Sequence, residues 1–166
     1  MPSNQNSGCL FNFRSILQQF LGEPAEETIL YRPNPKFLSP AEVTFYRALS
    51  AAVSTKYIVF AKVRLLDIIT PVSREKRQAH MNKVMSKHVD FALIDTQRHS
   101  VVAVVELDDS SHYGQKAIVR DEFVDGALKA AGIPTVRFRC RSSYDSNYIR
   151  ESIEEELEKW RHDNSR

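Results

Sequence analysis

Two apolar segments separated by a short polar break limit most strongly what this chain can fold into. They span His88–Asp95 and Val101–Asp109 and are rich in Val, Ile, Ala and Phe. Such residues favour half-buried pleated surfaces, so we expect two antiparallel strands joined by a tight turn. Both segments also contain carboxylates, which are depleted in strands and costly to bury unless they meet a cation or hydrogen-bond donors.

The antiparallel pairing should bring Asp90 and Glu106 together at one end of the sheet. Two negative charges at such a short distance favour the binding of a divalent cation between them. Asp108 lies two residues after Glu106 and should therefore point to the same face of its strand. Carboxylate oxygens without nearby thiolates favour Mg²⁺ or Mn²⁺ over zinc. We therefore expect Asp90, Glu106 and Asp108 to form a metal site.

Each carboxylate also has a structural explanation that the sequence leaves open. Asp90 could pair with His88 or Lys87 at the strand end. Glu106 could have a purely structural partner, and Asp108 could begin a turn, for which Asp is well suited. The chemical and the structural interpretations therefore have to be separated by geometry.

Further elements are expected on both sides of this pair of strands. Ser39-Pro40-Ala41-Glu42 has the residues of a capping box with Pro at the first helical position. In chain order we expect a helix from Pro40, a strand over 57–65, a helix over 75–85, the two strands, a helix over 119–131 that Gly132 ends, a strand over 135–140, and a helix from near Ser146. The strand–helix–strand crossover makes its two strands parallel, so we predict an α/β fold with a mixed central sheet flanked by helices.

A length of 166 residues is suited to one domain with its own core. Residues 1–30 are expected to be an extension with one short helix over 10–21, and residues 31–145 to be the core. Residues 146–166 should form an amphipathic helix that packs on the core through Ile149, Ile153, Leu157 and Trp160. The extension and this last helix are the candidate contacts for a homodimer or another protein partner.

The segment from Lys62 to Lys87 is basic, with seven basic residues against two acidic ones and a net charge of +5. This asymmetry predicts a face for an anionic partner, and the alternative is a solvated helix face of mixed charge. The expected nucleic-acid contacts are Lys62, Arg64, Arg74, Lys76, Arg77, Lys83 and Lys87.

Cys9 and Cys140 are the two cysteines, and they lack the spacing of a thiolate zinc site or a disulfide framework. No apolar stretch approaches the roughly 20 residues that cross a bilayer. The start of the chain also lacks the pattern of a secretory signal. We therefore expect a cytoplasmic protein that does not bind membranes.

Together, the residues also resemble a known family. The pattern consists of Val89-Asp90-Phe91, Glu106-Leu107-Asp108-Asp109-Ser110-Ser111-His112, Arg120-Asp121 and Ala131-Gly132-Ile133-Pro134 before an Arg-containing strand. It resembles a bacterial domain family of uncharacterised function within the PD-(D/E)XK, restriction-endonuclease-like superfamily, related to the very-short-patch-repair nucleases. The resemblance covers roughly Tyr31 to Arg141 and implies a single restriction-endonuclease-like domain.

The resemblance implies a role for each matching residue. Asp90 matches the metal-binding Asp, Glu106 the acidic residue of the next strand, and Glu42 the helical Glu near the site, although Glu42 also suits a capping box. Asp108 stands where the superfamily has Lys. The substitutes considered for that Lys are His112, Lys116 and Arg120; alternatively, Asp108 joins the metal ligands and no cation is needed.

The first functional hypothesis is a metal-dependent nuclease or nickase that hydrolyses DNA with Mg²⁺ or Mn²⁺, in DNA repair, defence or mobile-element processing. His112 could deprotonate the attacking water, or it could be an ordinary loop histidine. The second hypothesis is a non-catalytic nucleic-acid-binding module on the same fold. The third is a protein–protein adaptor that uses the last helix.

Overall fold

The computed structural model describes residues 30–108 and 115–165, with side chains described for 30–108 and 122–165. The chain divides into two units, Met1–Pro35 and Lys36–Arg166. Every described helix and strand lies in the second unit. The helix expected over residues 10–21 lies outside the described residues. None of the described helices is long and apolar enough to cross a membrane.

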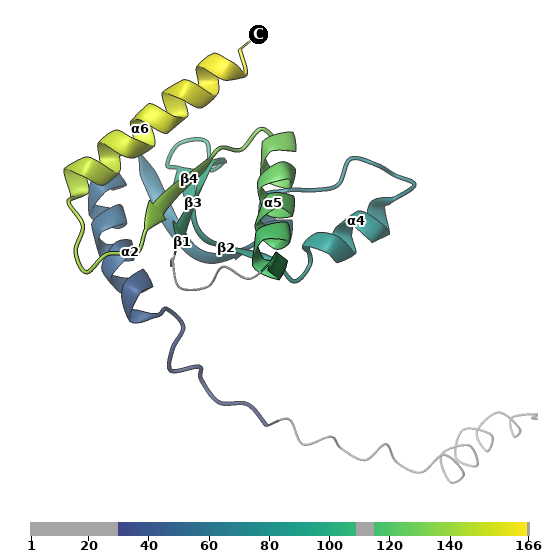
Figure 1. The fold of residues 1–166 in the computed structure, drawn as a ribbon, viewed down its shortest axis with the longest axis horizontal. Helices are drawn as coiled ribbons and strands as arrows, with labels where there is room; N and C mark the ends of the chain where they lie inside the picture. The colour runs from purple at the N-terminus through teal and green to yellow at the C-terminus, as the bar shows by residue number, and fades with distance from the viewer. Residues whose placement is uncertain (1–29, 109–114, 166) are drawn as a thin grey trace, which may run out of the picture. The chain divides into compact units, whose positions relative to one another are not determined.

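The second unit is built around one mixed sheet (Figure 1). The described elements are α2 (Pro40–Val53), β1 (Tyr57–Arg64), α3 (Leu65–Ile68), α4 (Arg77–Val84), β2 (His88–Asp95), β3 (Val101–Asp108), α5 (Gln115–Ala130), β4 (Thr135–Arg139) and α6 (Ser146–Asp163). The four strands lie in the order β1-β2-β3-β4. The pairs β1–β2 and β2–β3 are antiparallel, while β3 and β4 are parallel. The predicted α/β fold, a mixed sheet flanked by helices, is confirmed.

Local sequence signals account for the ends of two helices. The backbone N–H of Glu42 donates to the Ser39 hydroxyl at 3.2 Å, and the Ser39 N–H donates to the Glu42 carboxylate at 2.7 Å. This is the predicted capping box, with Pro40 at the first helical turn. Gly132 follows α5 with a φ of +76°, a left-handed conformation that glycine adopts at the lowest cost.

The two faces of the sheet carry separate apolar clusters. On one face, Phe45 of α2 and Ile149 of α6 pack with Phe91 of β2 and Phe138 of β4. The second cluster joins α5 to the strands through residues that include Val104 and Leu128. Figure 1 shows α2 and α6 side by side, away from α5. The clusters therefore hold the sheet between α2 and α6 on one face and α5 on the other.

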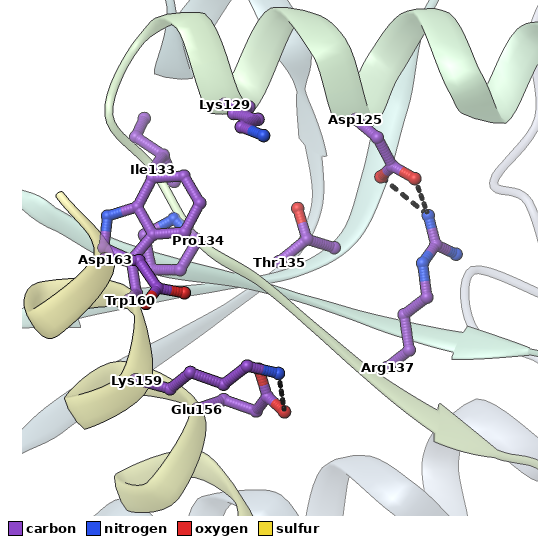
Figure 2. Close-up of a pocket in the computed structure, with 10 residues that line it drawn as sticks. All are labelled: Asp125, Lys129, Ile133, Pro134, Thr135, Arg137, Glu156, Lys159, Trp160 and Asp163. Carbon is purple, nitrogen blue, oxygen red and sulfur yellow. Dashed lines mark hydrogen bonds and ion pairs between the residues drawn. The ribbon is translucent and has the colours of Figure 1, made fainter.

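The apolar face of α6 is covered by the rest of the unit. Ile149, Ile153 and Leu157 are buried in the first cluster. Trp160 is half-buried, and its ring lies beside Ile133 and Pro134 at the edge of a pocket (Figure 2). The surface required by the adaptor hypothesis is therefore largely used within the unit.

Helix boundaries differ in detail from the expectation. Helix α5 begins at Gln115, four residues before the expected start, because Gln115-Lys116-Ala117 are good helix formers that the apolar periodicity does not register. The short helix α3 was not expected, since a single turn has too few residues to show a period. Helix α4 spans Arg77–Val84 where residues 75–85 were expected, and β4 ends one residue early, at Arg139.

Candidate functional site

One row of charged residues crosses the sheet from edge to edge. Lys62 on β1 lies between the register pairs Ala61–Phe91 and Val63–Val89, which places it beside Asp90 on β2. Asp90 and Glu106 lie directly beyond the register pair Phe91–Val105 of β2 and β3, and Glu106 pairs with Arg137 on β4. The two carboxylates therefore occupy the central strands, with one cation on each side.

Asp90 and Glu106 are tied to each other's strand by backbone hydrogen bonds. The N–H of Asp90 donates to Oε2 of Glu106 at 3.4 Å, a long bond. The N–H of Leu107 donates to Oδ2 of Asp90 at 3.0 Å. These bonds hold the two carboxyl groups next to each other, as expected from the antiparallel pairing.

This arrangement raises the pKa of Glu106 from 4.5 to about 8. Burial is the largest cause, and the negative charge of Asp90 adds to it. The positive charge of Arg137 acts in the opposite direction without cancelling the effect. At neutral pH and without a further cation, the pair of carboxyl groups therefore retains a proton.

Lys62 supplies the cation on the β1 side of the pair. Its ammonium forms an ion pair with Glu42 of α2 and lies 3.6 Å from Oδ1 of Asp90. Burial alone would lower the pKa of Lys62, but the hydrogen bond and charge of Glu42, followed by those of Asp90, raise it above its usual value. Lys62 is therefore a positively charged member of the site at neutral pH.

The backbone at Lys62 is unusual for a strand interior. Lys62 has a φ of +55°, in the left-handed region that residues other than glycine rarely adopt. Such conformations cost about 1–3 kcal/mol and persist where the surrounding structure enforces them. The side chain of Lys62 is held on this strand by its ion pairs with Glu42 and Asp90.

The sequence did not identify Lys62 as part of the site. We expected it on the nucleic-acid face, and the substitutes considered for the missing Lys came from residues after β3. The available signal was the pairing of the strands: once β1 is aligned antiparallel to β2, Lys62 lies beside Asp90.

Asp108 has a described partner of its own in Arg137 of β4. Nη1 of Arg137 donates to Oδ1 of Asp108 at 3.1 Å. Nη2 of the same guanidinium donates to both oxygens of Asp125 on α5, at 2.7 and 3.0 Å, as Figure 2 shows. Arg137 thus links the end of β3 to α5, and Asp108 is directed toward β4.

The oxygen donors of Asp90 and Glu106 suit a hard cation. Among the described residues, no group of three His, Cys, Asp or Glu side chains is arranged to hold a metal ion. Mg²⁺ in proteins is, however, commonly held by one or two carboxylates together with waters and substrate phosphates. Burial is the main cause of the raised pKa of Glu106, and the negative charge of Asp90 adds to it, which a bound cation would offset. The pair therefore fits Mg²⁺ or Mn²⁺, and the metal site stays a prediction.

The other predicted site residues divide into two groups. Glu42 has both expected roles, since it completes the capping box and binds Lys62. This double contact keeps the pKa of Glu42 low: burial raises it, but the hydrogen bonds from Lys62 and Ser39 outweigh burial. His112 lies outside the described residues. Lys116 and Arg120 belong to α5, but their side chains are not described.

The basic segment is only partly available to a partner. Lys62 forms ion pairs with Glu42 and Asp90. Arg64 forms a bidentate ion pair with Asp67 at 2.9 and 3.0 Å. The ammonium of Lys87 lies 5.5 Å from the centre of the Phe123 ring. The exposed members that form no ion pair with another described residue are Arg74, Lys76, Arg77 and Lys83, on and just before α4.

Comparison with known proteins gives a family but no function. A family model described as protein of unknown function DUF2726 matches residues 34–157, which include the whole charged row. No curated protein and no solved structure matches the chain. The match covers most of the chain, and the chain therefore belongs to the DUF2726 family.

Proposed function

We propose that this protein is a metal-dependent nuclease or nickase that hydrolyses phosphodiester bonds in DNA. The observation that carries the proposal is the adjacent pair Asp90 and Glu106, on neighbouring strands and flanked by Lys62 and Arg137. A structural ion pair would match each carboxylate with its own cation. Here two carboxyl groups face each other, and the pKa of Glu106 rises to about 8. Perturbed carboxyl groups of this kind concentrate at functional sites.

The resemblance to the PD-(D/E)XK superfamily supports the same reaction. Asp90 and Glu106 match the acidic residues on its two central strands, and their proximity agrees with that match. The superfamily's Lys is replaced by Asp108, but Lys62 brings an ammonium to 3.6 Å from Asp90. The lack of a Lys at position 108 therefore does not argue against catalysis.

In the proposed reaction each residue of the site has a separate role. A Mg²⁺ ion held by Asp90 and Glu106 would polarise the phosphodiester and lower the pKa of an attacking water. Lys62 would stabilise negative charge that develops on the phosphoryl oxygens, as a fixed cation next to the acidic pair. Glu42 orients Lys62, and the exposed cations around α4 would hold the nucleic-acid backbone by salt-sensitive contacts.

Cleavage of a small substrate panel tests the proposal. Supercoiled plasmid, duplex with mismatches, flaps and single strands are incubated with Mg²⁺, Mn²⁺ or EDTA. Wild type is compared with Glu106→Gln, which keeps the shape of the side chain, and with Glu155→Gln on the exposed face of α6 as the matched control. We expect cutting that requires metal, is lost in Glu106→Gln and survives in Glu155→Gln. Cutting that persists in Glu106→Gln would refute the assigned site.

A non-catalytic nucleic-acid-binding module is the second candidate, and the exposed cations of the α4 region favour it. In that case duplex affinity would fall steeply with salt while no substrate is cut and Mn²⁺ has no effect on stability. Replacing Arg74, Lys76 and Arg77 by Ala tests the contact surface itself. Unchanged affinity in that variant would remove this segment from the interface.

A further inference from the structure

A second basic feature lies at the other edge of the sheet, away from α4. A pocket of about 270 Å³ runs along β4 and the turn that follows it. It is lined by Arg137, Phe138, Arg139, Arg141, Tyr144 and Tyr148. Three arginines and no acidic side chain line this pocket, which is an unusual concentration of positive charge for the edge of a sheet.

Two of these arginines form no ion pair with another described residue. Arg137 binds Asp108 and Asp125, as described above. Among the ion pairs of the described residues, however, none involves Arg139 or Arg141, and both residues are exposed. Their guanidinium groups therefore present several N–H donors to an anion that enters from solvent.

The pocket is held in shape before any ligand arrives. The guanidinium carbon of Arg141 lies 5.6 Å from the centre of the Tyr148 ring, which positions the cation without removing its charge. The hydroxyl of Tyr144 accepts from the N–H of Arg141 at 2.7 Å and donates to the carbonyl of Arg139 at 3.1 Å. These contacts fix the turn between the two arginines, so less freedom is lost when they bind one ligand.

The position of the pocket relates it to the charged row. Arg139 pairs with Asp108 in the β3–β4 register, two residues beyond the pair Glu106–Arg137. Two residues along a strand span roughly 6.6 Å, and the next strand lies about 4.8 Å away. A ligand that reaches both the Asp90–Glu106 pair and Arg139 must therefore carry negative groups about one strand width and two residues apart. A nucleic-acid strand carries a negative phosphate at every nucleotide and can therefore place anionic groups at both positions.

We propose that Arg139 and Arg141 form a phosphate-binding subsite for the nucleic-acid strand whose scissile phosphodiester lies at Asp90 and Glu106. This inference rests on the proposed function, because it places one strand across both features. The subsite binds a backbone phosphate close to the one that is cut, and so sets the path of the strand from the acidic pair along β4. It is separate from the contacts expected around α4.

Equilibrium binding without catalysis tests the subsite. Affinity of the full-length protein for a labelled single strand and for the matching duplex is measured by fluorescence anisotropy in EDTA over a salt series. The test variant is Arg139→Ala/Arg141→Ala. The control variant, Arg98→Ala/Arg161→Ala, removes the same charge from two exposed arginines, in the β2–β3 turn and the last turn of α6.

Each arginine–phosphate contact contributes about 0.7 to the slope of log affinity against log salt for a single strand and about 0.9 for a duplex. We expect the test variant to lose about 1.4 from the single-strand slope or about 1.8 from the duplex slope. The control should keep the slope of wild type. Arg139→Gln is measured as well, because the Arg139 side chain makes no described bond and its replacement should not disturb folding; it should lose about 0.7 on a single strand.

The outcomes separate the subsite from the proposed nuclease. Equal slopes for test and control variants, with cutting that still depends on Glu106, would overturn the subsite and leave the nuclease standing. A reduced slope with no cutting anywhere on the substrate panel would keep the phosphate subsite and overturn the nuclease. Binding to neither strand nor duplex would overturn both.

Discussion

Replacing Glu106 by Gln should change how the stability of the protein depends on pH. In the unfolded chain Glu106 titrates near its ordinary pKa of 4.5, whereas in the folded protein burial and the charge of Asp90 raise its pKa to about 8. Between these two values the folded state keeps a proton that the unfolded state has lost. The favourable contribution is therefore complete below pH 4.5 and is lost progressively as pH rises to about 8. Gln cannot ionise, so the variant should escape this loss.

The size of the effect follows from the two pKa values. A rise from 4.5 to about 8 is about 3.5 pH units. At about 1.4 kcal/mol per unit, this sets an upper limit of about 5 kcal/mol. Glu106 is not fully buried, so solvent weakens the effect and we expect roughly half of that limit. Relative to wild type, Glu106→Gln should gain about 2 kcal/mol of unfolding free energy between about pH 5 and pH 9.

Urea denaturation in EDTA, repeated across this pH range, measures the difference directly. Glu155→Gln makes the same substitution at an exposed position of α6 and should follow the pH dependence of wild type. All three proteins contain the same histidines, so any contribution of these residues cancels in the comparison. Parallel curves for wild type and Glu106→Gln would show that Glu106 ionises normally. In that event the electrostatic argument for a functional acidic pair would fail.

Three further predictions concern the site and its support. Because Mn²⁺ must displace the proton of Glu106, the Mn²⁺ affinity measured by calorimetry should increase as pH rises toward about 8, with proton release. A pH-independent affinity would contradict the metal site. Lys62→Met should lower the rate of cutting by a factor of roughly 10²–10³, the typical effect of losing one charge-stabilising donor. The control variant Lys56→Met, which breaks a surface ion pair with Glu154, should cut at the rate of wild type. Ser39→Ala should cost about 1 kcal/mol of unfolding free energy through loss of the α2 cap, measured in urea against the exposed Ser143→Ala; equal stability of the two would contradict the capping role.

Much of the fold could be predicted because its signals are local. The β-favouring runs define β2 and β3, the capping box defines the start of α2, and Gly132 with Pro134 defines the end of α5. The parallel pairing of β3 with β4 followed from the helix between them. Each of these inferences needs only neighbouring residues or a general rule of chain topology.

The candidate site could be predicted from the sequence only where the pairing of two strands was itself predictable. Asp90 and Glu106 were expected to meet because the β2–β3 hairpin brings them together, and they do. The role of Lys62 depends on the register of β1, which no turn links tightly to β2. The hydrogen bond from Arg137 to Asp108 depends on the position of β4, and Arg137 is also bound by Asp125 of α5. Both elements come later in the chain than Asp108. Long-range pairing of charges leaves no local pattern in a sequence.

The contacts of Lys62 with Asp90 and of Asp108 with Arg137 suggest that a Lys on β1 can take the place of a Lys at position 108 on β3. A Lys two residues after Glu106 would stand roughly 6.6 Å along β3, while a residue on the next strand stands about 4.8 Å from its neighbour. A cation on β1 beside Asp90 therefore lies as close to the acidic pair as one at position 108 would. If the proposed nuclease uses Lys62 for that charge, position 108 needs no cation, and an Asp there can bind Arg137 and connect the end of β3 to α5. On this reasoning Lys62→Met/Asp108→Lys should recover part of the cutting that Lys62→Met loses, and a double variant no better than Lys62→Met would contradict the exchange.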